Sequence, residues 1–143
     1  MNSKENIIAL ADSKLIEAIH LSSFGFYDSA YYLGGYVIEL LFKAKICDHF
    51  EIDDFFEPVA DKYLERDALK PFKVHDLMQL LIFSGIFRKA QANIRTDDSF
   101  KNAWSVVRLW NESSRYEQGK DREFVMIFLD SVKIIQQWIT TYL

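Results

Sequence analysis

The sequence predicts an all-α fold, an antiparallel up-and-down bundle of four to five helices. Apolar residues recur every three to four positions through almost the whole chain, and strand-like alternation is scarce. Only 5 Gly and 2 Pro interrupt 143 residues, of which 50% are hydrophobic. A chain of this length forms one domain, residues 1–143, and typically buries roughly 68–70% of its unfolded surface. Its core therefore needs neither a metal nor a disulfide.

The first two helices are expected over residues 3–23 and 28–47. Ser3 is a suitable N-cap for the first helix, and Gly25 follows where a helix usually stops. Asp28 offers a second N-cap, and the apolar residues after it step by three and four along one stripe. The pattern therefore predicts a helical hairpin at the start of the chain.

Two adjacent glycines, Gly34 and Gly35, lie inside the second predicted helix. Each costs roughly 1 kcal/mol relative to alanine in a helix interior. Their usual purpose is the close approach of another backbone, here from the first helix or from a partner subunit. A purely structural dimer would place neighbouring residues at its interface: Phe26, Tyr31, Tyr32, Gly34 or Gly35.

Four further segments show helical spacing: residues 53–69, 75–87, 96–110 and 121–142. Pro71 ends the first of them, and Gly85 leaves open whether the second is continuous. The polar composition of residues 111–120 predicts a loop before the last helix.

The charge balance restricts the classes of partner. Seventeen Lys and Arg stand against 21 Asp and Glu, which gives a net charge of −4. This balance argues against non-specific DNA binding, which needs a basic footprint. It leaves room for a local site that takes a nucleotide or an RNA end.

The sequence indicates a cytoplasmic protein. No signal peptide is visible at the N-terminus, and the most apolar stretch, residues 30–46, is short and contains Glu39 and Lys43. Cys47 is the only cysteine, so no disulfide forms within the chain. Its apolar setting predicts a buried, inert thiol in a reducing compartment.

No metal or cofactor is expected from the motifs. The three histidines, His20, His49 and His75, are far apart in the sequence, and a zinc site lacks a second cysteine. Gly34 and Gly35 lie in a helical pattern rather than between a strand and a helix, so they do not form a phosphate-binding loop.

The first of three polar clusters consists of Tyr36, Glu39 and Lys43, which share one helix face. Glu39 precedes Lys43 by four residues, the favourable order for a surface ion pair worth a few tenths of a kcal/mol. A solvated pair is the simpler interpretation. The alternative is that the two side chains orient a ligand or partner.

The second cluster follows Pro71 and contains Lys73, His75 and Asp76. A helix N-terminus attracts anions, and Lys73 and His75 beside it are suited to hold a phosphate. In the simpler interpretation Asp76 complements the helix end and His75 is a hydrogen-bonded packing residue.

The third cluster lies in residues 110–116, where Arg115 precedes Tyr116. An arginine binds phosphate in bidentate fashion, and a neighbouring aromatic ring can cover a base. The same arginine could instead cap a helix C-terminus or pair with Glu39.

Together these clusters resemble the HEPN family, named for higher eukaryotes and prokaryotes nucleotide-binding. The matching segments are GFYDSAYYLGGYVIELLFKA at residues 25–44, KVHDL at 73–77 and WNESSRY at 110–116. The resemblance spans about residues 5–140. It implies an antiparallel helical bundle, often a homodimer, frequently encoded beside a small nucleotidyltransferase. Some members are RNA-cleaving toxins of toxin–antitoxin pairs, and others are non-catalytic binding or scaffold modules.

Cleaving members of the family share an arginine followed, after four to six residues, by a histidine. Arg115 lies in about the right place, but Lys120, Asp121 and Arg122 occupy the positions where the histidine is required. No arginine precedes any of the three histidines at that spacing. Because the histidine would accept the 2′-hydroxyl proton, its absence weighs against a ribonuclease.

The resulting hypothesis is a non-catalytic HEPN-like module that dimerises and binds a nucleotide or a protein partner, with a nucleotidyltransferase as the partner implied by the resemblance. The nucleotide pocket is expected between the second helix and the loop after residue 110. Its expected residues are Arg115 and Lys43 on the phosphate, Tyr116 on the base, Glu39 as an orienting group, and His75 or Lys73 assisting. The alternative is a divergent, metal-independent RNA-cleaving toxin with His75 as the base beside Arg115.

Overall fold

The computed structural model describes residues 3–52, 55 and 70–143. Over these ranges the chain forms six α-helices and no strand, so the all-α prediction is confirmed and the helix count exceeds the expected four to five. The helices are α1 (Lys4–Ser23), α2 (Tyr27–His49), α3 (Leu77–Phe83), α4 (Phe87–Thr96), α5 (Asp98–Val107) and α6 (Arg122–Thr140). Two short 3-10 turns are η2 (Lys70–Phe72) and η3 (Glu112–Tyr116). The helix expected over residues 53–69 lies outside the described residues, apart from Phe55.

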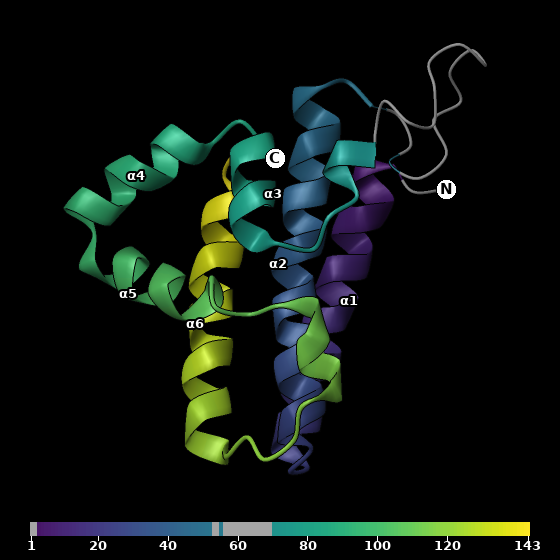
Figure 1. The fold of residues 1–143 in the computed structure, drawn as a ribbon, viewed down its shortest axis with the longest axis vertical. Helices are drawn as coiled ribbons and strands as arrows, with labels where there is room; N and C mark the ends of the chain where they lie inside the picture. The colour runs from purple at the N-terminus through teal and green to yellow at the C-terminus, as the bar shows by residue number, and fades with distance from the viewer. Residues whose placement is uncertain (1–2, 53–54, 56–69) are drawn as a thin grey trace.

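The three long helices α1, α2 and α6 form the body of the molecule (Figure 1). The helix α1 is antiparallel to α2, as expected, but α6 runs parallel to α2. Lys4 at the start of α1 shows this arrangement. Its ammonium donates to the Asp48 carboxylate at the end of α2 over 3.0 Å and to the Leu143 carbonyl beyond α6 over 3.2 Å. The prediction of a fully up-and-down bundle is therefore wrong, because α3 to α5 carry the chain back before α6 begins.

At the opposite end of the body, Asp28 connects the start of α2 to the loop before α6. Its carboxylate accepts the backbone N–H groups of Gly119 and Lys120, over 3.2 and 2.9 Å, from the loop that leads into α6. Asp28 therefore does not cap α2 as predicted, and α2 starts after Phe26 with no side-chain cap. The carboxylate instead ties the starts of α2 and α6 together.

Several predicted helix boundaries are confirmed by side-chain caps. Ser3 caps α1 and Asp121 caps α6, each accepting a backbone N–H from the first turn. Asp97 caps α5 in the same way, as the sequence indicated for residues 96–98. Gly25 follows α1 with a φ of +84°, a conformation that favours glycine and ends the helix.

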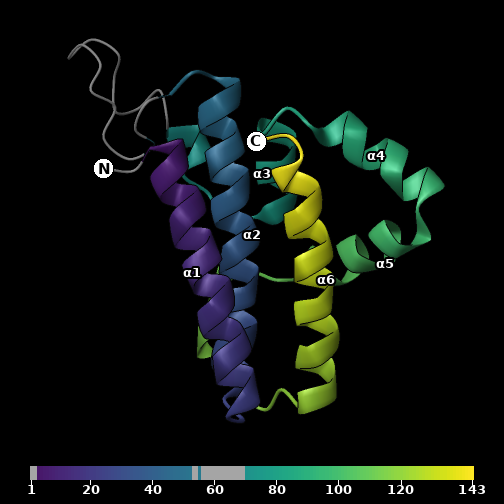
Figure 2. The ribbon, with the colours of Figure 1, turned by 180° about the vertical axis from the view of Figure 1, so that it is seen from behind.

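The middle of the chain departs from the expected pattern. Gly85, with a φ of +82°, separates α3 from α4, so the helix expected over residues 75–87 ends at Phe83. The helix α4 was not predicted, because most of its residues are polar and Ala90 is the only one that is buried. Figures 1 and 2 show α4 and α5 extending to one side of the three long helices.

At the two glycines of α2, side chains from other parts of the chain pack against the helix, and the backbone of α1 does not. A Cβ on Gly34 would lie 2.8 Å from Leu129 and 2.9 Å from Phe128, both on α6. A Cβ on Gly35 would overlap the indole ring of Trp110. The expectation of a backbone from α1 or a partner subunit is therefore wrong, because α6 and Trp110 occupy this space.

The core is centred on α2. Every residue from Val37 to Cys47 is buried, so this part of the helix is covered on all sides. Cys47 is among these residues, in agreement with the predicted buried thiol. Any charged side chain in this stretch must find its partner inside the protein.

Candidate functional site

Glu39 and Lys43 form a buried ion pair in the middle of α2. The Lys43 ammonium donates to the Glu39 carboxylate over 2.7 Å, and the two side chains are 5% and 2% exposed, respectively. The Lys43 ammonium also lies 5.7 Å from the centre of the Phe55 ring. The prediction of a solvated surface pair is therefore wrong, because this part of α2 is covered on all sides.

His75 connects this buried pair to the surface. Its Nδ1 lies 2.8 Å from the same Glu39 oxygen that Lys43 contacts, and its Nε2 lies 3.1 Å from the Glu112 carboxylate. Carboxylates only accept hydrogen bonds, so the imidazolium form is the one that donates to both partners. The His75 side chain is 47% exposed, which places it at the boundary between core and solvent.

Arg115 lies at the outer end. One guanidinium nitrogen is 3.6 Å from the second oxygen of Glu112, and the guanidinium carbon lies 4.9 Å from the centre of the Tyr116 ring. The neighbouring Tyr116 raises the pKa of Arg115, with further contributions from Glu112 and a hydrogen bond to Tyr32. Arg115 is therefore a permanent cation on the surface of the protein.

These contacts form a continuous series of alternating charges, which we call the polar chain: Lys43, Glu39, His75, Glu112 and Arg115. It joins the three polar clusters of the sequence, from α2 through the segment before α3 to η3. Asp76 helps to position His75, because its carboxylate caps α3 by accepting the backbone N–H of Gln79.

Trp110 determines where η3 lies on α2. Its ring packs against Gly35 and lies 5.9 Å from the ring of Tyr32. Ser114, inside η3, is also buried. These contacts fix the short turn against α2, so that Glu112 and Arg115 project at the edge of the body.

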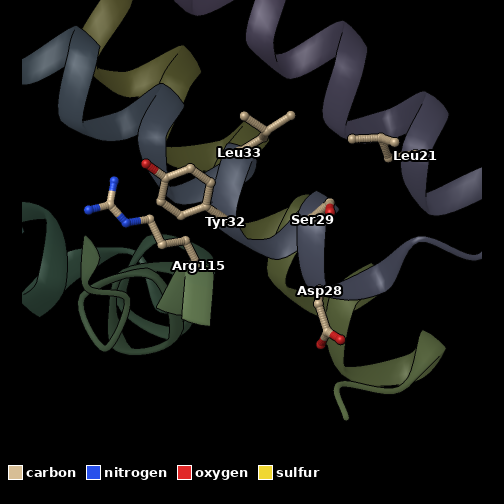
Figure 3. A pocket seen from close by; sticks show the side chains of 6 residues that line it. All are labelled: Leu21, Asp28, Ser29, Tyr32, Leu33 and Arg115. Carbon is tan, nitrogen blue, oxygen red and sulfur yellow. The ribbon is translucent and has the colours of Figure 1, made fainter. Parts of the chain in front are cut away.

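A surface cavity of about 360 Å³ lies beside Arg115. It is lined by Leu21, Asp28, Ser29, Tyr32, Leu33 and Arg115. Figure 3 shows the Arg115 guanidinium directed toward the Tyr32 hydroxyl at one end of the cavity, with Asp28 and Ser29 toward the other. The cavity thus combines a cation, an aromatic and aliphatic floor, and hydroxyl and carboxylate groups.

The predicted site residues are only partly brought together. Glu39, Lys43, His75 and Arg115 belong to the polar chain, and Tyr116 lies against Arg115. Lys43 is buried, contacts the same Glu39 oxygen as His75, and does not line the cavity. Lys73 is exposed two residues before His75.

Sequence reasoning missed Glu112 and Tyr32. Glu112 precedes Arg115 by three residues in the same polar segment, a spacing typical of an ion pair on a helical turn. Tyr32 offered no such signal, because its role depends on the way η3 folds back onto α2.

No group of three metal-ligating side chains occurs in the part of the chain that the structure describes. Within the same residues no helix has the length and apolar character needed to cross a bilayer. A scan against models of protein families, a search of curated proteins and a search of solved structures each found no match to this chain. The polar chain and the cavity are therefore the features of this protein that bear on its function.

Replacing Glu39 by Gln should lower the free energy of unfolding by about 3 kcal/mol. Removing one member of a buried ion pair leaves the other charge uncompensated in a medium of low dielectric constant. Urea denaturation monitored by circular dichroism measures the change.

The matched control is Glu112→Gln, the same substitution at the exposed end of the polar chain. Its cost should stay below about 1 kcal/mol, as for partly exposed ion pairs. The double variant Glu39→Gln/Lys43→Met should recover part of the lost stability. Equal costs at positions 39 and 112 would show that burial of the pair does not govern its energetics.

Proposed function

We propose that the protein is a non-catalytic HEPN-like module that dimerises and binds a nucleotide at the cavity beside Arg115. The observation that supports this best is the position of the Arg115 guanidinium. It is exposed at the edge of a cavity, contacts the Tyr116 ring and the Tyr32 hydroxyl, and Glu112 ties it to the polar chain. A guanidinium held in this way is suited to bind a phosphate group with two parallel hydrogen bonds.

The rest of the cavity suits the remainder of a nucleotide. Its volume of about 360 Å³ falls within the usual range for small-molecule sites, roughly 300–1,000 Å³. Tyr32 and Leu33 provide a surface for a base or sugar, and Ser29 offers a hydroxyl for hydrogen bonding. Compared with the sequence-based hypothesis, Tyr32 takes the place of Lys43 in the set of ligand-binding residues.

The state of His75 supports a non-catalytic role. A general base needs a free lone pair at the nitrogen that accepts the proton. Both ring nitrogens of His75 face carboxylate oxygens, at 2.8 and 3.1 Å. In this arrangement both ring nitrogens are directed at glutamate oxygens, so the function of His75 is to link the two glutamates.

One observation favours the alternative, a metal-independent RNA-cleaving toxin. Glu112 contacts both His75 and Arg115, so a titratable imidazole and a phosphate-binding guanidinium meet at one carboxylate. If a substrate displaced Glu112, the Nε2 of His75 would become accessible beside Arg115. The resemblance to HEPN toxins is consistent with this role, although the arginine-to-histidine motif is missing.

The dimer is supported by exposed aromatic residues at the turn between α1 and α2. Phe24 and Phe26 are 78% and 60% exposed. They line an apolar groove of about 390 Å³ together with Leu21 and Leu33. A second copy of the chain would cover this apolar surface. Of the interface residues expected from the sequence, Phe26 remains exposed, whereas Tyr31, Gly34 and Gly35 are buried within the chain.

A nucleotide should raise the melting temperature of the parent protein, and the rise should grow with the logarithm of its concentration above the dissociation constant. Ligand at 100 times its dissociation constant contributes about 2.7 kcal/mol, which corresponds to roughly 5–10 °C for a domain of this size. Thermal unfolding is measured with adenosine and with its mono-, di- and triphosphates, and with the corresponding guanosine series. Arg115→Ala should abolish the shift, whereas Arg122→Ala on α6 should retain it.

Two results would contradict the nucleotide site. One is an equal rise in melting temperature with the nucleosides and with their phosphates, which would show that the phosphate does not contribute to binding. The other is an unchanged shift in Arg115→Ala. Arg115 is exposed, so its replacement should leave the melting temperature of the free protein close to that of the parent.

The parent protein should be a dimer, and Phe24→Ser/Phe26→Ser should be a monomer at the same concentration. The double variant makes the exposed apolar groove polar without touching the core. Sedimentation equilibrium gives the mass. The control Ile82→Ser/Leu109→Ser changes two other exposed apolar residues and should leave the dimer intact. A parent protein that is monomeric throughout, or a double variant that remains dimeric, would exclude this interface.

RNA should stay intact after prolonged incubation with equimolar protein in the presence of a metal chelator. Gel analysis of labelled single-stranded RNA provides the readout. Cleavage that His75→Gln abolishes and Lys73→Gln preserves would establish the toxin alternative. Cleavage that neither substitution changes would indicate a contaminating nuclease.

A further inference from the structure

The charges of the molecule are distributed unevenly between the body and the α4–α5 arm, which we define as residues 87–108. The arm contains five of the 17 basic residues and only two of the 21 acidic ones, so its net charge is +3 and that of the rest of the chain is −7. Its basic residues are Arg88, Lys89, Arg95, Lys101 and Arg108. The overall charge of −4 therefore conceals a local basic surface.

All five cations are exposed. Arg88 and Arg95 lie seven residues apart on α4, two turns along the same helix face and about 10 Å from each other along the axis. Lys101 and Arg108 have the same spacing on α5 and at its C-terminal end. Ala90, the buried residue of α4, is on the side opposite Arg88, which directs the Arg88–Arg95 face to solvent.

No carboxylate of the described residues neutralises these four cations, Arg88, Arg95, Lys101 and Arg108. Within the described part of the chain, no ion pair involves Arg88, Arg95, Lys101 or Arg108. Lys89 contacts the face of the Tyr142 ring at 5.3 Å. Asp97, one of the two acids of the arm, is occupied in capping α5. The arm thus keeps its positive charge available for a partner.

We propose that the α4–α5 arm binds the phosphodiester backbone of a single-stranded nucleic acid. Arginine and lysine side chains, with serine, threonine, asparagine and glutamine, are the groups that contact phosphates in such complexes. The exposed residues of the arm have this composition: in addition to its cations they include Gln91, Thr96, Ser99, Asn102 and Ser105.

The other surfaces of the arm narrow the choice of partner. All of its residues are described, and none of its large apolar side chains is exposed, so it lacks the apolar face that a lipid surface requires. Phe100 and Trp104 are buried and offer no platform for base stacking. Binding therefore depends on the backbone rather than on the base sequence.

A single strand fits this charge distribution better than a duplex. The described residues outside the arm have 10 basic and 13 acidic side chains, a net charge of −3, which repels a long, rigid polyanion lying across them. A flexible strand can follow the arm alone. This proposal is independent of the cavity beside Arg115, which takes one nucleotide whether or not the arm binds a strand.

The test measures fluorescence anisotropy of a labelled 20-nucleotide oligouridylate RNA and of the matching single-stranded DNA over a range of salt concentrations. For single strands the logarithm of the binding constant falls by about 0.7 per phosphate contact for each unit of log salt. Arg88→Gln/Arg95→Gln should weaken binding at least tenfold at low salt and reduce this slope by about 1.4. Equal effects on RNA and DNA identify the shared backbone as the ligand, and effects on RNA alone identify RNA.

The matched control is Lys14→Gln/Arg122→Gln, which removes the same charge from α1 and α6. It should change affinity less than twofold, and thermal melts verify that both double variants fold. Equal losses in the two double variants would overturn the proposal, as would a parent protein that binds neither strand at low salt. Displacement of the strand by polyglutamate at equal charge concentration would also overturn it, in favour of an acidic protein partner.

The same variants show which of the two proposals fails, strand binding at the arm or nucleotide binding at the cavity. Arg88→Gln/Arg95→Gln should retain the mononucleotide-induced rise in melting temperature. Arg115→Ala should retain the salt slope of strand binding to the arm.

Discussion

Glu39 places a carboxylate in the most deeply buried part of the molecule, and the polar residues of three segments are arranged around that charge. An isolated charge at this position would cost several kcal/mol, so it must be compensated within the protein. Lys43 compensates it from the next turn of α2, and His75 lies within hydrogen-bond distance of it from the segment before α3. The buried ion pair therefore specifies where the middle of the chain docks on the central helix.

The parts of the fold that local rules govern could be predicted from the sequence. Ser3, Asp97 and Asp121 are caps in the structure because their short side chains satisfy backbone N–H groups wherever they precede a helix. The direction of α6 could not be predicted, because it depends on how far the excursion through α3, α4 and α5 carries the chain. The contact of Asp28 could not be predicted either, since its carboxylate accepts a backbone N–H from Gly119, which is 91 residues away in sequence.

The candidate site shows why spacing alone does not settle the environment of a pair. Glu39 and Lys43 have the same four-residue separation as a pair on a solvated helix face. Glu39 and Lys43 differ from such a pair because other elements cover α2, and a local sequence pattern does not contain that information. Arg115 was identifiable because arginine in a polar segment beside a tyrosine suits an anion. Its partner Tyr32 was not, since their contact requires Trp110 to pack on Gly35.

The polar chain has a buried end and an exposed end, and this division separates its structural and binding functions. Glu39 and Lys43 are sealed in the core, whereas the side chains of His75, Glu112 and Arg115 are 47%, 33% and 45% exposed. An anion that approaches Arg115 competes with Glu112 at 3.6 Å, the longest contact in the polar chain, and leaves the inner contacts of the polar chain intact. Trp110 and the buried Ser114 hold η3 in position, while the weak contact between Glu112 and Arg115 leaves the guanidinium free to exchange partners.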